Sequence, residues 1–300
     1  MTDRPAASVI VPTRNRPGRL AACLNSLERQ DYPRGLWRLV VVNDGGADPS
    51  PAFPPGLPVT LLHAAPRGPA AARNRGAAAA ETDLLVFLDD DCRAGPSWLS
   101  EIIRGIVSSP YQACMGRTLN GRPDRWPARA YQYFMEFHRD YARMPNDDLY
   151  LVMSNNAVYR RDAFWTAGGF NEDFPRPGAE DLELSHRLAA GGGRQGYLPQ
   201  AVLHHAHNAT AAGYVRQQFQ YGRGFARMAG HLHRDGIPLL IGQRRRPQFH
   251  LHLLGTMLRH PPGIRESLLV WAGILAHAAG ARWEGLRPGF ARSDPAGGAS

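Results

Sequence analysis

Lysine is missing from this 300-residue sequence, and all 35 of its basic residues are arginine. The formal net charge at pH 7 is +9 when the histidines are counted as neutral. A basic chain can bind nucleic acid, an anionic membrane or phosphorylated small molecules, and arginine favours bidentate contact with phosphate. Because alanine, glycine and proline are also abundant, a GC-rich coding bias explains much of the arginine excess. Charge alone therefore does not decide between these partners.

Cysteine is scarce, and long hydrophobic runs are absent. Cys23, Cys92 and Cys114 leave one thiol unpaired in any scheme and show no CxxC spacing, which argues against a disulfide framework and a zinc site. No run approaches the roughly 18–20 apolar residues that span a bilayer. The polar start of the chain and the short apolar run Val9–Val11 do not fit a secretory signal. We therefore expect a cytoplasmic protein.

Short apolar runs alternate with helical patterns in the first third of the chain. Strands are predicted at Ser8–Val11, Leu39–Val42, Val59–Leu62 and Leu84–Leu88, and helices at Leu20–Leu27 and Ala70–Ala80. This order predicts an α/β fold with a mostly parallel sheet, which binds ligands at the carboxyl ends of its strands. Polar clusters follow three of these strands, at Thr13–Asn15, Asn43–Asp44 and Asp89–Asp91. A site is expected where they meet.

The rest of the chain is more helical. Helices are predicted at Tyr131–Tyr141 and Asp181–Ala190, and strands at Asn156–Tyr159 and Val202–Leu203. From Ala211 the pattern is helical and basic, with apolar parts at Leu239–Ile241 and Leu268–Ile274 and a Pro/Gly/Ala-rich tail from Arg287 that we expect to fray. We expect a catalytic domain over residues 1–225 and a C-terminal helical extension over residues 226–300.

The acidic triplet Asp89, Asp90 and Asp91 directly follows a predicted buried strand. Three adjacent carboxylates repel one another, and at such a position the repulsion is costly without a cation. Hard divalent cations take oxygen ligands and bind substrate phosphates through one or two carboxylates. A solvated loop, or a cap for a helical turn at Pro96–Ile103, explains the triplet equally well.

Other carboxylates also have two interpretations. Asp44, after an apolar run, is able to accept hydrogen bonds from a ribose or a base, or to cap a turn. Glu180, Asp181 and Glu183 open a predicted helix. Asp181 there is either a helix cap or a general base that removes a proton from an acceptor hydroxyl.

Basic and histidine clusters complete the candidates. Arg67, Arg73 and Arg75 lie before and within the helix that leads to the acidic strand, where they either pair with diphosphate oxygens or form a solvated basic face. Three histidines in four residues, which suggest a ligand cluster, follow an apolar strand: His204, His205 and His207.

Six segments carry a family resemblance. They are Ser8–Asn15 (SVIVPTRN), Val40–Gly46 (VVVNDGG), Ala72–Gly76 (ARNRG), Phe87–Asp91 (FLDDD), Gly168–Glu172 (GGFNE) and Glu180–Leu184 (EDLEL). Taken in order, they resemble the family 2 glycosyltransferases of GT-A fold, from about residue 6 to about residue 208. No single motif is decisive, but six in the right order make the resemblance specific.

The resemblance implies inverting transfer of a sugar from a nucleoside diphosphate sugar, first of all a UDP-sugar, with Mn²⁺ or Mg²⁺ as cofactor. Asp91 matches the metal ligand of the DxD motif, and Asp181 matches the catalytic base, with Glu180 in the vicinity of the acceptor or donor sugar. Some members add a downstream histidine ligand, for which we choose His205, with His207 second. The residues expected to bind the nucleotide sugar are Pro12, Thr13, Arg14, Asp44, Arg73, Asp89 and Asp90.

The expected product and setting follow from two further features. Processive synthases of the family carry a Q-x-x-R-W signature after the base, whereas Arg216–Gly224 reads RQQFQYGRG without tryptophan. We therefore expect one or a few sugars to be added to a saccharide or lipid-linked acceptor, in bacterial cell-envelope, polysaccharide or glycolipid synthesis. Arg244–Arg246 and Leu268–Ala279 either lie on the inner face of the cell membrane or, as we favour slightly, pack over the catalytic domain.

Three other functions were weighed against this one. A sugar nucleotidyltransferase needs a Gly-rich N-terminal loop with a lysine, which Pro12–Gly18 does not provide. A basic nucleic-acid-binding protein would explain the charge, but acidic strand ends repel phosphate unless a metal is bound. An inactive scaffold is disfavoured by the presence of Asp91 and Asp181. We expect no nucleic-acid partner.

Overall fold

The computed structural model describes residues 5–144, 146–174, 176–207, 210–240 and 246–286. Within these residues the strands form one mixed eight-stranded sheet in the order β3-β2-β1-β4-β7-β6-β8-β5. The strands are β1 (Ala7–Thr13), β2 (Trp37–Asp44), β3 (Val59–Ala64), β4 (Leu84–Leu88), β5 (Cys92–Ala94), β6 (Ala113–Asn120), β7 (Asn156–Arg160) and β8 (Gln195–His205).

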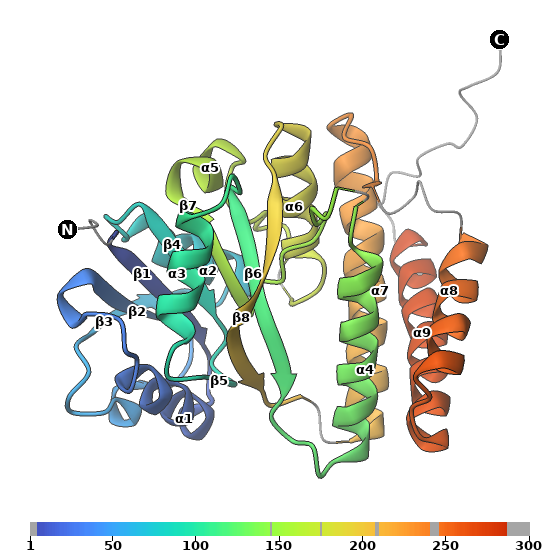
Figure 1. Ribbon diagram of the computed structural model, residues 1–300, viewed down its shortest axis with the longest axis horizontal. Coiled ribbons are helices and arrows are strands. Elements are labelled where there is room, and N and C mark those ends of the chain that lie inside the picture. Colours follow the sequence, from blue (N-terminus) through green and yellow to red (C-terminus); the bar gives the residue numbers. More distant parts are fainter. Residues whose placement is uncertain (1–4, 145, 175, 208–209, 241–245, 287–300) are drawn as a thin grey trace.

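Helices cover both faces of this sheet, and a group of long helices stands beside it (Figure 1). The α/β class with helical flanks and a C-terminal helical extension is as predicted. The helices are α1 (Pro17–Glu28), α2 (Pro69–Ala78), α3 (Trp98–Val107), α4 (Trp126–Tyr141), α5 (Arg161–Thr166), α6 (Glu180–Ala190), α7 (Ala211–Arg234), α8 (Arg246–Arg259) and α9 (Ile264–Gly285).

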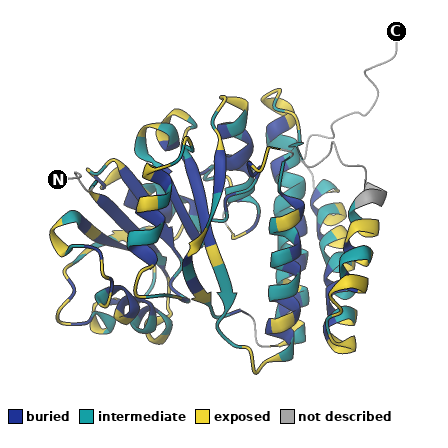
Figure 2. Cartoon of the chain, viewed as in Figure 1, coloured by how far each residue is buried: buried dark blue, intermediate teal, exposed yellow. Residues whose placement is uncertain are grey.

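The first four strands are parallel, with β1 between β2 and β4 and with β3 outside β2. The apolar runs of β1, β2 and β4 are buried on both faces because α1 and α3 pack on one side and α2 on the other. These three strands are almost wholly buried, whereas β3 at the sheet edge is partly exposed (Figure 2). Since the carboxyl ends of β1, β2 and β4 lie at one edge, the polar residues that follow them are brought together, as expected.

The sheet is mostly parallel, as predicted, but two strands in its second half run in the opposite direction. β7 is antiparallel to both β4 and β6, and β5 is antiparallel to β8. The triplet is followed by the short strand β5, and α3 begins only at Trp98. Val202–Leu203 proves to be part of an eleven-residue strand, β8. β6 was not predicted, because its apolar start gives way to a polar end and its register shifts between Gly116 and Arg117.

The C-terminal helices pack closely on one another. α7 and α9 approach at glycines: Gly222 lies against the backbone of His277, and Gly280 lies against the backbone of Phe219. The expected boundary at residue 225 falls within α7, so a division of the chain there remains a proposal. In the part of the chain that the structure describes, no helix has both the length and the apolar character needed to cross a bilayer. The basic pair Arg244–Arg245 and the tail from Arg287 lie outside the described residues.

Candidate active site

Asp91 is the most heavily contacted carboxylate of the triplet. Its Oδ1 lies 2.9 Å from Nε2 of His205, and its Oδ2 accepts hydrogen bonds from Arg19 at 2.8 Å and Arg16 at 3.4 Å. Burial alone would raise the pKa of Asp91, but the hydrogen bond from His205 and the charges of the three basic groups hold it well below its usual range. These basic neighbours keep Asp91 in its carboxylate form.

The pairing of β5 with β8 brings the histidine cluster to the triplet. His205 lies opposite Cys92, the residue after Asp91, and His204 lies opposite Arg93. Because side chains alternate along a strand, His204 points away and is exposed, whereas His205 faces Asp91. His207 is buried behind His205, with the two Nδ1 atoms 2.8 Å apart. Of the three histidines, His205 is thus the one in contact with the triplet.

Three side chains around His205 form a candidate donor set for a metal ion. Ligand atoms of Asp91, Cys92 and His205 all lie within 4.8 Å of one another. The Cys92 thiol is buried against the core and directed at the carbonyl of Asn155, and burial raises its pKa well above the usual value, so it stays neutral. A carboxylate and an imidazole, with substrate phosphate oxygens in addition, suit Mn²⁺ or Mg²⁺. These residues fit the expected metal.

Asp90 joins the ends of two neighbouring strands. It accepts hydrogen bonds from Thr13 at the end of β1, at 2.8 Å, and from Arg16, at 3.1 Å. Burial raises its pKa to about 6. Of the other residues expected near the nucleotide, Pro12 is half-buried within β1 and Arg14 is exposed just after it. Their contact with nucleotide, and that of Thr13 and Asp90, remains a prediction.

Asp44 caps the loop that leads into α2. Its Oδ1 accepts the backbone N–H of Arg67 at 2.9 Å, and its Oδ2 accepts that of Gly68 at 3.1 Å. Gly68 has φ +98°, a conformation that favours glycine. Asp44 thus caps a distant loop, whereas Asn43 caps the turn after β2 by accepting the backbone N–H of Gly46 at 3.0 Å. A contact of Asp44 with the nucleoside stays a prediction.

Arg73 is the structural link between distant parts of the site. It is only 4% exposed, and its guanidinium donates to Asp89 at 2.7 Å and to Glu180 at 3.1 Å. Burial alone would lower the pKa of Arg73, but these two carboxylates raise it. Arg75 is exposed on the solvated face, and Arg67 pairs with Glu172 at 3.0 Å. Of the three arginines, Arg73 alone bridges the triplet to the Glu-Asp pair.

Asp181 lies in the first turn of α6, close to Glu180. The chain enters this helix through Ala179 in the left-handed conformation, with φ +67°. Asp181 accepts backbone N–H groups from Ser154 at 3.2 Å and from Leu182 at 2.9 Å. Burial and the adjacent Glu180 raise the pKa of Asp181 to about 6. A carboxylate with this pKa is a suitable general base near neutral pH.

The sequence matches the description "Glycosyl transferase family 2" over residues 8–168, more than half of the chain. The chain belongs to glycosyl transferase family 2. The pre-mycofactocin glycosyltransferase of Mycobacterium tuberculosis is 29% identical over 259 residues, which cover 84% of this chain and 53% of that protein. The validoxylamine A glucosyltransferase of Streptomyces hygroscopicus is 28% identical, with 63% of this chain and 52% of that protein covered. The chain thus spans about half the length of these relatives, whose names agree with the expected enzyme class.

Two solved structures show the same fold as this family 2 member. The mannosyltransferase PcManGT from Pyrobaculum calidifontis, in complex with GDP-Man and Mn²⁺, superposes with a TM-score of 0.64 and 21% identity, over 94% of this chain and 76% of that one. TarS residues 1–349 from S. aureus superpose with a TM-score of 0.55 and 19% identity, over 93% of this chain and 83% of that one. At these identities the likeness concerns the fold, and it confirms the GT-A architecture.

Sequence reasoning missed several polar residues of the site in this family 2 chain. Arg16 and Arg19 contact Asp91 from the start of α1, and their i, i+3 spacing just after β1 was the available signal. Asn15, in the left-handed region at φ +54°, accepts the backbone N–H of Ala47 at 2.9 Å and so joins the loops after β1 and β2. Gln132 contacts His207 from α4, which no local pattern suggested.

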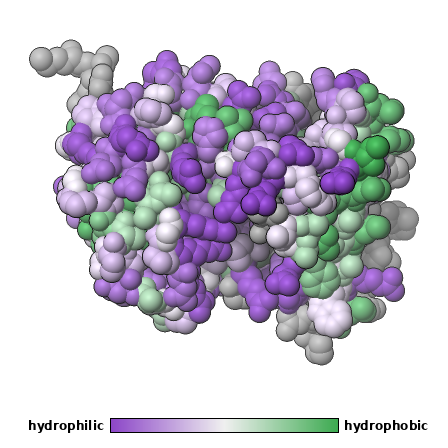
Figure 3. Space-filling view, turned by 90° about the horizontal axis from the view of Figure 1, so that it is seen from below, coloured by the Kyte–Doolittle hydropathy of each residue, from purple (hydrophilic) through white to green (hydrophobic). Residues whose placement is uncertain are grey.

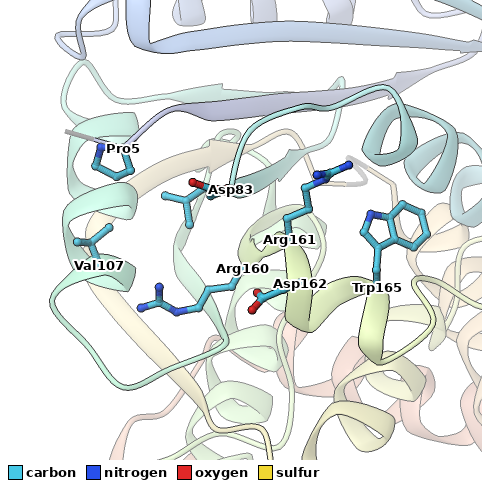
Figure 4. Close-up of a pocket in the computed structure, with 8 residues that line it drawn as sticks. Pro5, Asp83, Val107, Arg160, Arg161, Asp162 and Trp165 are labelled. Atoms are coloured by element: carbon cyan, nitrogen blue, oxygen red, sulfur yellow. The ribbon is translucent and has the colours of Figure 1, made fainter. Parts of the chain in front are cut away.

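A hollow of about 710 Å³ lies elsewhere, at the opposite end of β4 from the triplet (Figure 4). Asp83 and Leu84 line it, together with Arg160, which pairs with Leu84 across β4 and β7. The Arg160 guanidinium donates to the carbonyls of Tyr111 and Ile106, each at 3.0 Å, and so supports the end of α3. This hollow is separate from the residues proposed for catalysis.

Proposed function

We propose that this chain transfers a sugar from a nucleoside diphosphate sugar to an acceptor hydroxyl, with inversion at the anomeric carbon. The observation that carries the proposal is the bridge made by Arg73, which binds Asp89 after β4 and Glu180 at the start of α6. This bridge holds the expected nucleotide side of the site next to the carboxylate of Asp181. Residues for binding the donor and a base for activating the acceptor would then lie at one edge of the sheet.

The donor is proposed to lie along the ends of β1, β2 and β4. Arg16 and Arg19 have side chains that are 52% and 41% exposed, and they are the cations best placed to meet a diphosphate beside Asp91. We keep a UDP-sugar as the first candidate. A solved neighbour contains GDP-Man and another contains UDP, so both bases belong in the test.

Asp91 and His205 are proposed to hold the metal. A divalent cation there would supply charge neutralisation for the diphosphate leaving group. Asp181 accepts the proton of the acceptor hydroxyl as the acceptor oxygen bonds to the anomeric carbon. The bond to the diphosphate oxygen breaks on the opposite face, which inverts the configuration. A positioned base of this kind accelerates a reaction by roughly 10²–10⁴-fold.

Release of nucleoside diphosphate tests this proposal. Purified protein with Mn²⁺ would be given UDP-, GDP- and dTDP-sugars with saccharide and lipid-linked acceptors, and the anomeric configuration of any product would be read by NMR. We expect acceptor-dependent release and an inverted product, of one or a few added sugars. A retained configuration would exclude the role given to Asp181, and absence of transfer from every donor would count against the activity.

We also propose peripheral contact with an anionic membrane, on the inner face of the cell membrane, through the outer face of α8 and α9. This face shows as hydrophobic surface at the right of Figure 3. Leu258 is 76% exposed and Ile264 is 81% exposed. The exposed apolar residues, spaced to share one side of each helix, are Leu251, Leu254, Leu258, Ile264, Leu268 and Leu275.

The charges around this face support an anionic partner. Between Arg246 and Leu286 the sequence contains two carboxylates, Glu266 and Glu284, and both are buried. Glu266 pairs with Arg129 at 2.7 Å, and Glu284 pairs with Arg223 at 2.8 Å. The charged residues left on the exposed side are all basic: Arg259, Arg265 and Arg282. A surface of exposed leucines and arginines, with its carboxylates turned inward, is suited to bind an anionic lipid surface.

Vesicle co-sedimentation tests the membrane contact. We expect binding to phosphatidylglycerol vesicles that weakens with salt and is much poorer for phosphatidylcholine. Leu258→Glu with Leu268→Glu should reduce binding at least about tenfold, since each leucine contributes about 1.5–3 kcal/mol. Val107→Glu, at an exposed apolar position on α3, is the matched control. Absence of binding would refute the proposal, as would a dimer that the paired substitution dissolves.

A further inference from the structure

A chain of hydrogen bonds leads from His205 into α4. Nδ1 of His205 lies 2.8 Å from Nδ1 of His207, and Nε2 of His207 lies 3.0 Å from Oε1 of Gln132. The Gln132 amide nitrogen donates to the carbonyl of Thr118 at 3.0 Å and to Oε1 of Glu136 at 2.9 Å. His207 is only 2% exposed, so water competes little for the contacts of its ring.

The acceptors around Gln132 decide which group donates in each of these hydrogen bonds. Thr118 O and the Glu136 carboxylate both accept, so the amide nitrogen must face them and the amide oxygen must face His207. An amide oxygen only accepts, so Nε2 of His207 carries a hydrogen. Reversing the amide would place its oxygen against two acceptors, which is costly in this partly buried position.

The two histidines then share one hydrogen between their Nδ1 atoms. If it sat on His207, that ring would be a cation, buried against the ring of Tyr131 at a centroid distance of 4.3 Å, and within the described residues its hydrogen-bond partners, His205 and Gln132, are not carboxylates. An uncompensated buried charge is costly. The hydrogen therefore belongs to Nδ1 of His205. Nε2 of His205 donates to the Asp91 carboxylate in the absence of a metal, and it is the nitrogen that a metal ion would bind in place of that hydrogen.

We propose that Gln132 and His207 are positioning residues that select the His205 tautomer able to bind the metal through Nε2. Glu136 and Thr118 act one step further out by fixing the orientation of the Gln132 amide. The inference rests on the proposed metal at Asp91 and His205. Groups that orient a ligand in this way commonly change metal affinity by about 10–100-fold when they are replaced.

Mn²⁺ affinity, measured by calorimetry on the full chain, tests this inference. Gln132→Met and His207→Leu should weaken binding about 10–100-fold. His207→Asn should bind nearly as tightly as the wild type, because its amide oxygen can accept from His205 in place of Nδ1. His204→Leu, at the exposed neighbour, is the matched control and should be unchanged. A Gln132→Met or His207→Leu variant that binds Mn²⁺ as tightly as the wild type would overturn the inference.

Histidine-ring ¹⁵N NMR of the wild type with Mg²⁺ gives a second readout that does not depend on a variant folding. We expect His205 to carry its hydrogen at Nδ1 and His207 to carry its hydrogen at Nε2. The opposite tautomers would overturn the inference even if the metal binds. Absence of Mn²⁺ binding by the wild type would instead refute the metal site itself, and the positioning role with it.

Discussion

At the scale of single residues, three adjacent aspartates are distinguished by their partners. Asp89 binds Arg73, Asp90 binds Thr13, and Asp91 meets His205. Their pKa values diverge accordingly, because burial raises that of Asp90 to about 6 while the basic neighbours of Asp91 lower its own. Sequence adjacency therefore says little about chemical equivalence.

The pH dependence of turnover tests the role of Asp181. Because a base acts in its ionised form and the pKa of Asp181 is raised to about 6, kcat/KM should rise with pH through about 6 and then level off. Asp181→Asn should lower kcat by roughly 10²–10⁴-fold and abolish that rise, with donor binding retained. Asp90→Asn is the control, since Asp90 also has a pKa of about 6. If Asp90→Asn instead abolished the rise of kcat/KM with pH, that rise would be assigned to Asp90 and not to Asp181.

Substitutions of Asp91 and of its neighbour Cys92 should have different effects on metal binding. Asp91→Asn removes the ionised ligand and should abolish a Mn²⁺-dependent rise in melting temperature. Cys92→Ala should keep that rise, because the buried thiol stays neutral. Differential scanning fluorimetry with and without Mn²⁺ makes the comparison, and the opposite result would move the site toward the thiol.

The residues that could be predicted from sequence are those at strand ends. Asp44 and the triplet follow strong apolar runs, so their position at the sheet edge is encoded locally. The contact of His205 with Asp91 depends on the register of β5 against β8, far apart in the chain, and only the family resemblance pointed to it. Gln132 lies on a helix whose place beside the site is set by tertiary packing.

At the scale of secondary-structure elements, the ion pair between Arg73 and Glu180 connects α2 to α6. Arg73→Met would leave Glu180 buried without a counter-charge, and loss of one partner of such a pair costs about 3–5 kcal/mol. Chemical denaturation should show a loss of this size in the free energy of unfolding. Adding Glu180→Gln should recover part of it. A loss below about 1 kcal/mol for Arg73→Met would contradict the bridging role.

The α7–α9 contact depends on glycine. A Cβ on Gly280 would collide with the backbone of Phe219, so Gly280→Ala should destabilise the protein by about 1–3 kcal/mol through overpacking. Gly255→Ala on α8 is the matched control, because nothing lies near its Cβ position and alanine favours a helix by about 0.5–1 kcal/mol. Equal unfolding free energies for the two variants would refute the close packing.

The elements that sequence reasoning recovered are those whose packing is local. β1, β2 and β4 are continuous apolar runs between helices on both faces, and their positions were predicted within a few residues. The antiparallel direction of β7 was not predicted, because strand direction is decided by chain connections rather than by the strand's own residues. β6 was missed since its polar second half resembles a loop.

At the scale of the whole molecule, the Arg73 bridge joins the end of β4 to the start of α6, and α8 and α9 present exposed leucine and arginine side chains. The family assignment covers residues 8–168, which include the triplet and end before Asp181. Asp181, the histidine cluster and the C-terminal helices lie beyond this match, so their proposed roles rest on the contacts described above.

Binding of nucleotide sugars tests the central claim most directly. Melting temperatures of the wild type would be measured with UDP-, GDP- and dTDP-sugars, each with and without Mn²⁺. At 100 times its Kd a ligand stabilises by about 2.7 kcal/mol, so a clear rise in melting temperature is expected for at least one donor, and only when Mn²⁺ is present. No rise with any donor, or a rise that ignores the metal, would contradict the account.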